Sequence, residues 1–175
     1  SSRRRHTRFR NVTGVQTCAL PILGCRCPVC RSRDPKNRRT RASIWIRTRG
    51  RSLLVDSSLD LRQQALREKM LRVDAVLYTH PHADHIGGLD DLRSYNYLQQ
   101  QDLPVYGNDW TISELRGRYP YIFTPSPSYE EGGGTARLIP HLLSDTQLES
   151  GKPLLIQGVP VLPVPVRHEI GRAHV

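Results

Sequence analysis

The segment THPHADHIGG at residues 79–88 places three histidines and one aspartate within six positions, directly after the apolar run DAVLYT. In an extended segment alternate side chains share a face, so His80 and His82 can offer imidazole nitrogens to one cation. Asp84 and His85 lie on the turn that must follow, where they can reach a second cation. Because two metals about 3.5 to 4 Å apart form a hydrolytic pair, the spacing predicts a dinuclear metal site.

The residues around this motif alternate between strand and helix patterns. Asn108 or Asp109 is expected to cap one helix, and residues 124–135 read as a loop. Prolines in the last apolar run favour an edge or an irregular path over the centre of a sheet. The patterns predict strands at 42–47, 52–56, 74–79, 103–107, 136–143, 153–157 and 159–168, and helices at 59–71, 88–100 and 108–119. This order predicts one α/β domain without internal repeats.

The pattern H-x-H-x-D-H after a strand, with LLVD upstream, resembles the signature of the metallo-β-lactamase-fold hydrolases. The resemblance implies an α/β fold that forms the N-terminal part of a four-layer αββα sandwich. It implies that His80 and His82 bind the first metal and that Asp84 and His85 bind the second. Asp84 is also the implied catalytic residue, which would orient the attacking water or take its proton.

Two further residues follow from the same resemblance. His168, at the end of the run VPVLPVPVRH, is the implied third ligand of the first metal. Asp56 ends LLVD and resembles the aspartate that steadies a ligand histidine in the family. The family also uses a bridging carboxylate and a last metal histidine beyond the position of His168, and neither follows here. We therefore expect an incomplete sandwich and an inactive chain as given.

A cluster of three cysteines narrows the resemblance to one branch of this family. An odd number this close together favours a metal over disulfides. The run GCRCPVC, which holds Cys25, Cys27 and Cys30, resembles the branch that contains the phosphoribosyl cyclic phosphate phosphodiesterase. The resemblance implies that these thiolates hold a structural zinc whose fourth ligand is not identified.

Within this branch, the implied activity is that of a phosphodiesterase acting on a small cyclic phosphate through a hydroxide shared by two divalent metals, Zn or Mn. Other activities stay open at this point. A thioesterase or lactonase, or a transfer-RNA 3′-processing nuclease, would carry the same motif. A different class is a non-enzymatic zinc module that binds nucleic acid through the cysteines and the nearby arginines.

The two ends of the chain resemble segments that were added to a natural sequence. The run TCALPI at residues 17–22 can be encoded by DNA whose reverse complement reads IGRAHV, the residues 170–175. Both ends therefore resemble translated sequencing adapter, and such segments are excluded from fold reasoning. We expect residues 1–23 and 169–175 to be non-native, and residues 24–168 to form a partial domain.

The net charge of the chain indicates which kinds of partner the protein can bind. The whole chain has 26 Lys and Arg against 16 Asp and Glu, a net charge of +10, which falls to +5 within residues 24–168. The smaller excess argues against nucleic acid as a partner. No apolar run approaches the length of a membrane span, so we expect a cytoplasmic protein, with a small phosphate ester as substrate and a homodimer as one possible assembly.

Overall fold

The computed structural model describes residues 23–124 and 134–166. The chain divides into two compact units, Ser1–Thr40 with Val166–Val175 and Arg41–Pro165. His168 lies outside the described residues, as do segments 1–22 and 169–175 and most of the expected loop at 124–135. The smaller unit contains the cysteine segment and the short helix η1 (Pro35–Asn37), which Asp34 caps by accepting the Lys36 N–H.

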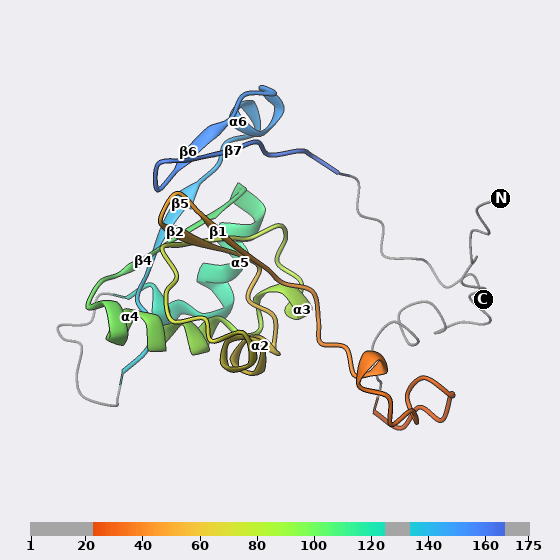
Figure 1. The fold of residues 1–175 in the computed structure, drawn as a ribbon. Helices are drawn as coiled ribbons and strands as arrows, with labels where there is room; N and C mark the ends of the chain where they lie inside the picture. The colour runs from red at the N-terminus through yellow and green to blue at the C-terminus, as the bar shows by residue number, and fades with distance from the viewer. Residues whose placement is uncertain (1–22, 125–133, 167–175) are drawn as a thin grey trace. The chain divides into compact units, whose positions relative to one another are not determined.

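The larger unit is built on a five-stranded sheet (Figure 1). Its strands in spatial order are β1 (Ile44–Thr48), β2 (Arg51–Val55), β3 (Ala75–Leu77), β4 (Leu103–Gly107) and β5 (Leu138–Leu142). β1 is antiparallel to β2, and all later pairs are parallel. Arg49 and Gly50 connect β1 to β2 with positive φ angles of 51° and 71°. This two-residue loop is the type I′ hairpin that suits the twist of paired strands.

The helices pack on one face of this sheet (Figure 1). They are α2 (Leu61–Glu68), α3 (Ala83–Ile86), η2 (Leu89–Leu92), α4 (Arg93–Gln99), α5 (Asp109–Arg118) and η3 (Pro120–Ile122). Leu54, Val76 and Val105 of the sheet lie in one buried cluster with Leu92 and Leu115 of the helices. Asn108 caps α5 as expected, because its Oδ1 accepts the Thr111 N–H at 2.9 Å.

A small second sheet covers part of the opposite face. It consists of β6 (Leu154–Ile156) and β7 (Val159–Val161), preceded by the helix α6 (Asp145–Glu149). Leu53 and Ala75 pack there against Ile156 and Val159. Neighbouring residues such as Leu53 and Leu54 therefore serve opposite cores, which is why β2 and β3 are apolar on both faces. Helices, sheet and second sheet form part of an αββα sandwich, so the predicted fold class is confirmed.

Some predicted boundaries are wrong. The strand expected at 159–168 ends at Val161, and residues 162–166 are not in a strand. Pro163 and Pro165 supply no N–H donors, which explains the early end. The helix expected at 59–71 ends at Glu68, because Lys69 adopts a left-handed conformation with φ 52°. The helix expected at 88–100 starts with the 3₁₀ turn η2.

The helix α6 was missed by the sequence patterns. Its signal is a capping box, in which Ser144 Oγ accepts the Gln147 N–H and Gln147 Oε1 accepts the Ser144 N–H. Nowhere in residues 23–124 and 134–166 is a helix long and apolar enough for a bilayer crossing.

Candidate metal centre

The histidine motif lies at the carboxyl end of β3. Tyr78 continues the pairing by donating its N–H to the Tyr106 carbonyl at 2.8 Å, after which the chain leaves the sheet. His82 is extended, with φ −69° and ψ 148°, and precedes α3, which contains Asp84 and His85. The motif therefore has the expected form, an extended segment that turns into a helix.

The structure brings the four motif residues together. The ring of His80 has its centroid 4.5 Å from that of His82 and 4.0 Å from that of His85. Asp84 Oδ2 lies 3.6 Å from His85 Nε2, and the Asp84 side chain is 61% exposed. Three imidazoles and one carboxylate are a donor set that suits Zn or Mn.

Asp56 supports this cluster from the end of β2. Its side chain is buried, and its backbone has φ 60°, a left-handed conformation that aspartate tolerates better than most residues. Asp56 Oδ1 accepts the Thr79 N–H at 2.8 Å, and Oδ2 accepts the Thr79 hydroxyl at 2.8 Å. The same Oδ2 lies 2.7 Å from His85 Nδ1. Asp56 thus contacts a histidine of the motif, and its role beside a bound metal stays a prediction.

These contacts fix where the protons lie on two rings. A carboxylate only accepts hydrogen bonds, so His85 Nδ1 carries a hydrogen, and in the neutral ring His85 Nε2 then keeps its lone pair. Because the Thr79 hydroxyl donates to Asp56, its oxygen accepts from His80 Nδ1, which is 2.9 Å away. In the neutral ring, His80 Nε2 then also keeps its lone pair. One carboxylate orients both rings, directly for His85 and through Thr79 for His80.

Thr79 was not identified from the sequence as a site residue. The only signal is a hydroxyl side chain directly before the first histidine, and its meaning depends on Asp56, which is 23 residues away. A second missed residue is Arg118 of α5, whose Nη1 donates to the Pro81 carbonyl at 2.9 Å. Arg118 also pairs with Glu114 at 2.6 Å, so α5 holds the backbone of the motif.

The layer beneath the motif is polar but buried. Ser57 Oγ and Tyr78 Oη form a hydrogen bond of 2.7 Å. Burial raises the pKa of Tyr78 far above its usual value, against the opposing effect of the Ser57 hydrogen bond, and the Asp56 charge raises it further. Tyr78 is therefore a neutral phenol under the histidine motif.

Gly88 sets the spacing between the motif and the loop after β2. Its N–H donates to the Ser57 carbonyl at 2.8 Å. A Cβ atom on Gly88 would collide with the Ser58 carbonyl oxygen and press on Leu61. The two segments can approach this closely only with glycine at this position.

The cysteine cluster is a separate candidate metal site in the smaller unit. Cys25, Cys27 and Cys30 are thiols, and their sulfur atoms all lie within 4.8 Å of one another. Over the described ranges, no other three His, Cys, Asp or Glu side chains bring their ligand atoms this close together, so the donors of the histidine motif are more widely spaced. Hydrogen bonds from the backbone and side chain of Cys30 lower the pKa of Cys27 to about 7. A thiolate near neutral pH suits a soft ion such as zinc.

Comparison with known proteins places the chain in a family. The family model described as the beta-lactamase superfamily domain matches residues 51–175. An octanoyltransferase of Porphyromonas gingivalis (strain ATCC BAA-308 / W83) is 44% identical over 116 residues, which are 66% of this chain and 23% of that protein. The probable metallo-hydrolase YybB of Bacillus subtilis (strain 168) is 31% identical over 72 residues, which are 41% of this chain and 29% of that protein.

A solved structure supports the same placement. The crystal structure of a new diphosphatase from the PhnP family is 34% identical with a TM-score of 0.70, and the match covers 87% of this chain and 54% of that one. The chain thus spans about half of this structure and less than a third of each curated relative.

Proposed function

The chain belongs to the metallo-β-lactamase superfamily, and we propose that the protein is a metal-dependent hydrolase of small phosphodiesters, with a cyclic phosphate as its substrate. The observation that carries the proposal is the gathering of the imidazoles of His80, His82 and His85, two of which are oriented by Asp56. The similarity to a PhnP-family diphosphatase supports phosphorus rather than a carbonyl carbon as the atom attacked.

Each motif residue has a proposed role. His80 and His82 would hold one divalent metal, with His168 as a third ligand, while Asp84 and His85 would hold the second. Metals bound there would supply an activated water and neutralise charge on the phosphoryl oxygens. The Asp84 carboxylate is exposed beside His85, so it can accept the proton of the attacking water.

A structural zinc on the cysteines is a separate part of the proposal. Cys25, Cys27 and Cys30 would supply three thiolate ligands of a tetrahedral ion. Cobalt(II) added to the protein should give the intense thiolate-to-metal absorption of such a site. The variant Cys27→Ser should lose this band, whereas His82→Ala should keep it.

A second candidate activity is diphosphate hydrolysis, which the name of the solved relative favours. Both substrates present a tetrahedral phosphorus with anionic oxygens, so the same metal pair would serve either. They differ in the leaving group, which is a sugar oxygen in a cyclic phosphate and a second phosphoryl group in a diphosphate.

The test is a panel of substrates incubated with the Zn- or Mn-loaded protein extended to the length of its relatives, because the chain as given, which spans about half of the solved relative, is expected to be inactive. The metal content is measured in the same sample. The panel holds a five-membered cyclic ribose phosphate, a diphosphate diester, a thioester, a lactone and a precursor transfer RNA. We expect the cyclic phosphate to open to a monoester fastest and His80→Ala to abolish the reaction. Hydrolysis of the thioester or lactone by metal-loaded protein, without cleavage of any phosphodiester, would show that the proposal is wrong.

A further inference from the structure

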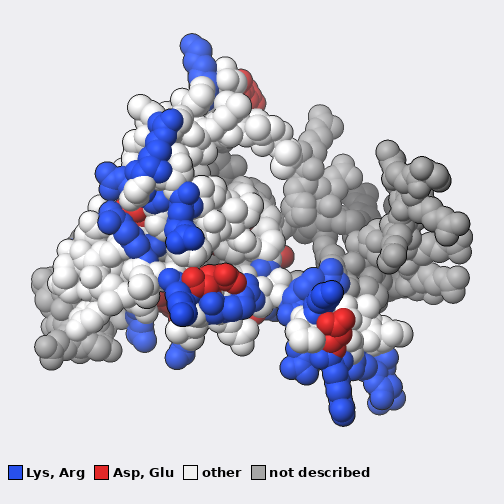
Figure 2. Space-filling view, viewed as in Figure 1, with Lys and Arg blue, Asp and Glu red and all other residues white. Residues whose placement is uncertain are grey.

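A basic hollow lies at the end of the sheet opposite the histidine motif. It has a volume of about 670 Å³, is open to solvent and is lined by ten residues of the β1–β2 hairpin and the segment after α2. Five of the ten are basic and none is acidic, the basic ones being Arg47, Arg49, Arg51, Lys69 and Arg72. In Figure 2 basic side chains gather on the left-hand side of the molecule, where Figure 1 places the turn between β1 and β2.

Little of this charge is compensated by neighbouring acids. The buried carboxylate of Asp74 pairs with Arg72 at 2.7 Å and with Arg51 at 3.6 Å, while both guanidinium groups remain about half exposed. One carboxylate thus faces two of the five cations. Arg47, Arg49 and Lys69 have no ion pair among those that the described residues form. The hollow therefore carries a strong net positive charge.

Side-chain hydrogen bonds and one cation–π contact connect the segments that carry the basic groups. Trp45 Nε1 donates to Ser52 Oγ at 2.7 Å, and Ser52 Oγ in turn donates to the Arg72 carbonyl. The Arg47 guanidinium lies over the Trp45 ring, 4.7 Å from its centroid. These contacts tie the hairpin to the segment that carries Arg72, so the backbone segments that carry the cations are held together before any ligand arrives.

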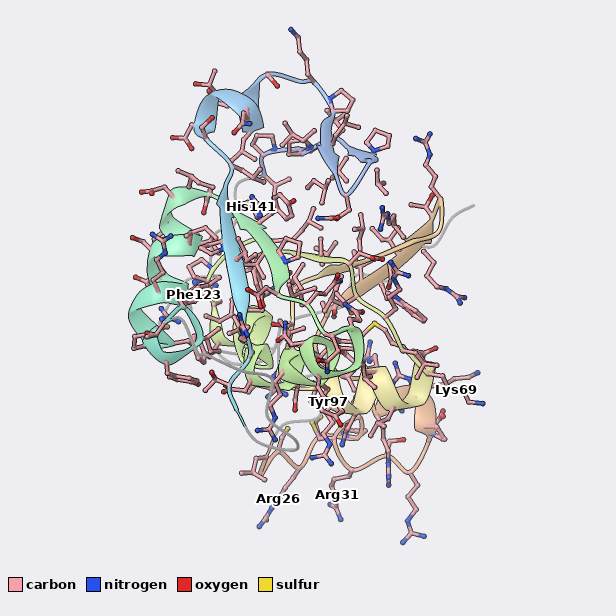
Figure 3. The ribbon with its side chains drawn as sticks, turned by 90° about the vertical axis from the view of Figure 1, so that its left-hand side faces the viewer. Arg26, Arg31, Lys69, Tyr97, Phe123 and His141 are labelled. Atoms are coloured by element: carbon pink, nitrogen blue, oxygen red, sulfur yellow. The ribbon has the colours of Figure 1, made fainter. Side chains whose placement is uncertain are left out.

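We propose that this hollow binds the phosphodiester backbone of single-stranded RNA. Four of the five cations are arginines, whose forked donors match phosphate oxygens in a bidentate manner. The cations line an open hollow and come from separate elements, which suits a strand that presents several phosphates in a row. Lys69 extends from the end of α2 on the same side as the hairpin (Figure 3).

This surface is distinct from the proposed hydrolytic site. β2 runs from Arg51 in the hollow to Val55 beside Asp56, so the length of a strand separates the two. The proposal also revises the expectation drawn from charge alone. A net charge counted along the chain cannot show that five cations from residues 47–72 line one hollow.

The test measures binding of a fluorescently labelled oligouridylate about twelve nucleotides long, a length within the usual site sizes for single strands, at several salt concentrations. The key variant is Arg47→Gln with Arg49→Asn. Asparagine accepts the positive φ of residue 49 and makes the Asn-Gly turn that suits this hairpin. The matched control is Arg31→Gln with Arg33→Asn, which removes the same charge from the smaller unit.

The expected result is a loss of affinity of about tenfold in the hairpin variant, with a salt slope reduced by about 1.4, since each phosphate contact on a single strand contributes about 0.7. The control should change affinity less than about twofold. Lys69→Asn removes a cation at the end of α2 and should weaken binding by about threefold. Asparagine tolerates the left-handed conformation of residue 69, so the variant keeps the helix end.

An equal loss in the hairpin variant and the control would overturn the proposal, because binding would then be spread over all basic residues. The proposal would also be overturned if the hairpin variant bound RNA as tightly as the original protein but no longer bound anionic phospholipid vesicles. That result would assign the surface to a membrane. Thermal unfolding of each variant checks that the fold is kept. Substrate hydrolysis is not a readout here, so failure of either proposal is recognisable by itself.

Discussion

Asp56 Oδ2 lies 2.7 Å from His85 Nδ1, although the two residues are 29 positions apart. The contact links the end of β2 to α3 and determines which nitrogen of His85 faces outward. A substitution at Asp56 should therefore affect the metal site before it affects the fold.

Asp56→Asn is the sharpest form of this substitution, because asparagine accepts φ 60° and has nearly the same shape. An amide oxygen accepts more weakly than a carboxylate, so both His80 and His85 lose part of their orientation. We expect the affinity for Zn or Mn at the histidine motif to fall about 10- to 100-fold, measured by isothermal titration. An unchanged affinity in the folded variant would contradict the role assigned to Asp56.

Thr79→Val should remove the link between Asp56 and His80 while keeping the volume of the side chain. The His80 ring would lose the acceptor at its Nδ1, and we expect metal affinity to fall about tenfold. Thr79→Ser keeps the hydroxyl and should stay near the original affinity. Titration of both variants against the same metal, with thermal unfolding as a control for stability, separates loss of the hydroxyl from loss of packing.

Asp74 should make stability depend on acidic pH. Burial raises the pKa of Asp74, but hydrogen bonds from Arg72 and the Ser52 N–H, with the charges of Arg72 and Arg51, outweigh burial and hold that pKa below its usual value. A lowered pKa in the folded state stabilises the protein above the unfolded pKa of about 3.9. This stabilisation is lost as the pH falls through the folded value.

Asp74→Asn should therefore lower the free energy of unfolding at neutral pH by about 1 to 3 kcal/mol and flatten its decline below about pH 4. Denaturant titrations over a pH series provide the measurement. Glu149→Gln, which changes an exposed carboxylate at the end of α6, serves as the control and should leave the pH profile unaltered.

Gly88→Ala and Gly117→Ala form a matched pair. At Gly88 the added methyl collides with the backbone at Ser58, so we expect a loss of about 1 to 3 kcal/mol in stability. At Gly117, in the last turn of α5, an added Cβ would meet no atom within 4 Å apart from the neighbouring helix backbone, and alanine should stabilise the helix by about 0.5 to 1 kcal/mol. Equal unfolding temperatures for the two variants would refute the close approach at Gly88.

The sequence predicted the order of the main elements and the fold class because apolar periodicity and turn residues are local signals. The motif residues His80, His82, Asp84 and His85 were recognisable for the same reason, since their spacing alone brings them together. The role of Thr79 could not be read from the sequence, because it depends on a carboxylate that tertiary folding brings into reach.

Other failures have a similar cause. The helix expected at 59–71 ends at Glu68, and its Leu66 is 71% exposed although Leu61 of the same helix is buried, because tertiary packing decides which residues face the core. His168 lies beyond the described residues, so its place among the ligands stays a prediction. The compartment, the homodimer and the phosphate ester substrate likewise stay predictions.

Pro140 lies in β5, the last strand of the five-stranded sheet. Leu103 donates its N–H to the Arg137 carbonyl, and Leu143 donates its N–H to the Gly107 carbonyl. Because successive residues of a strand point their N–H groups to opposite sides, the odd-numbered residues of β5 point theirs toward β4 and the even-numbered ones point away. The nitrogen of Pro140 therefore points away from β4, toward the open side of the strand, and carries no hydrogen there. Among the described residues no strand pairs with β5 on that side, and a strand that extended the sheet there would meet no N–H donor at Pro140, a feature that disfavours such pairing.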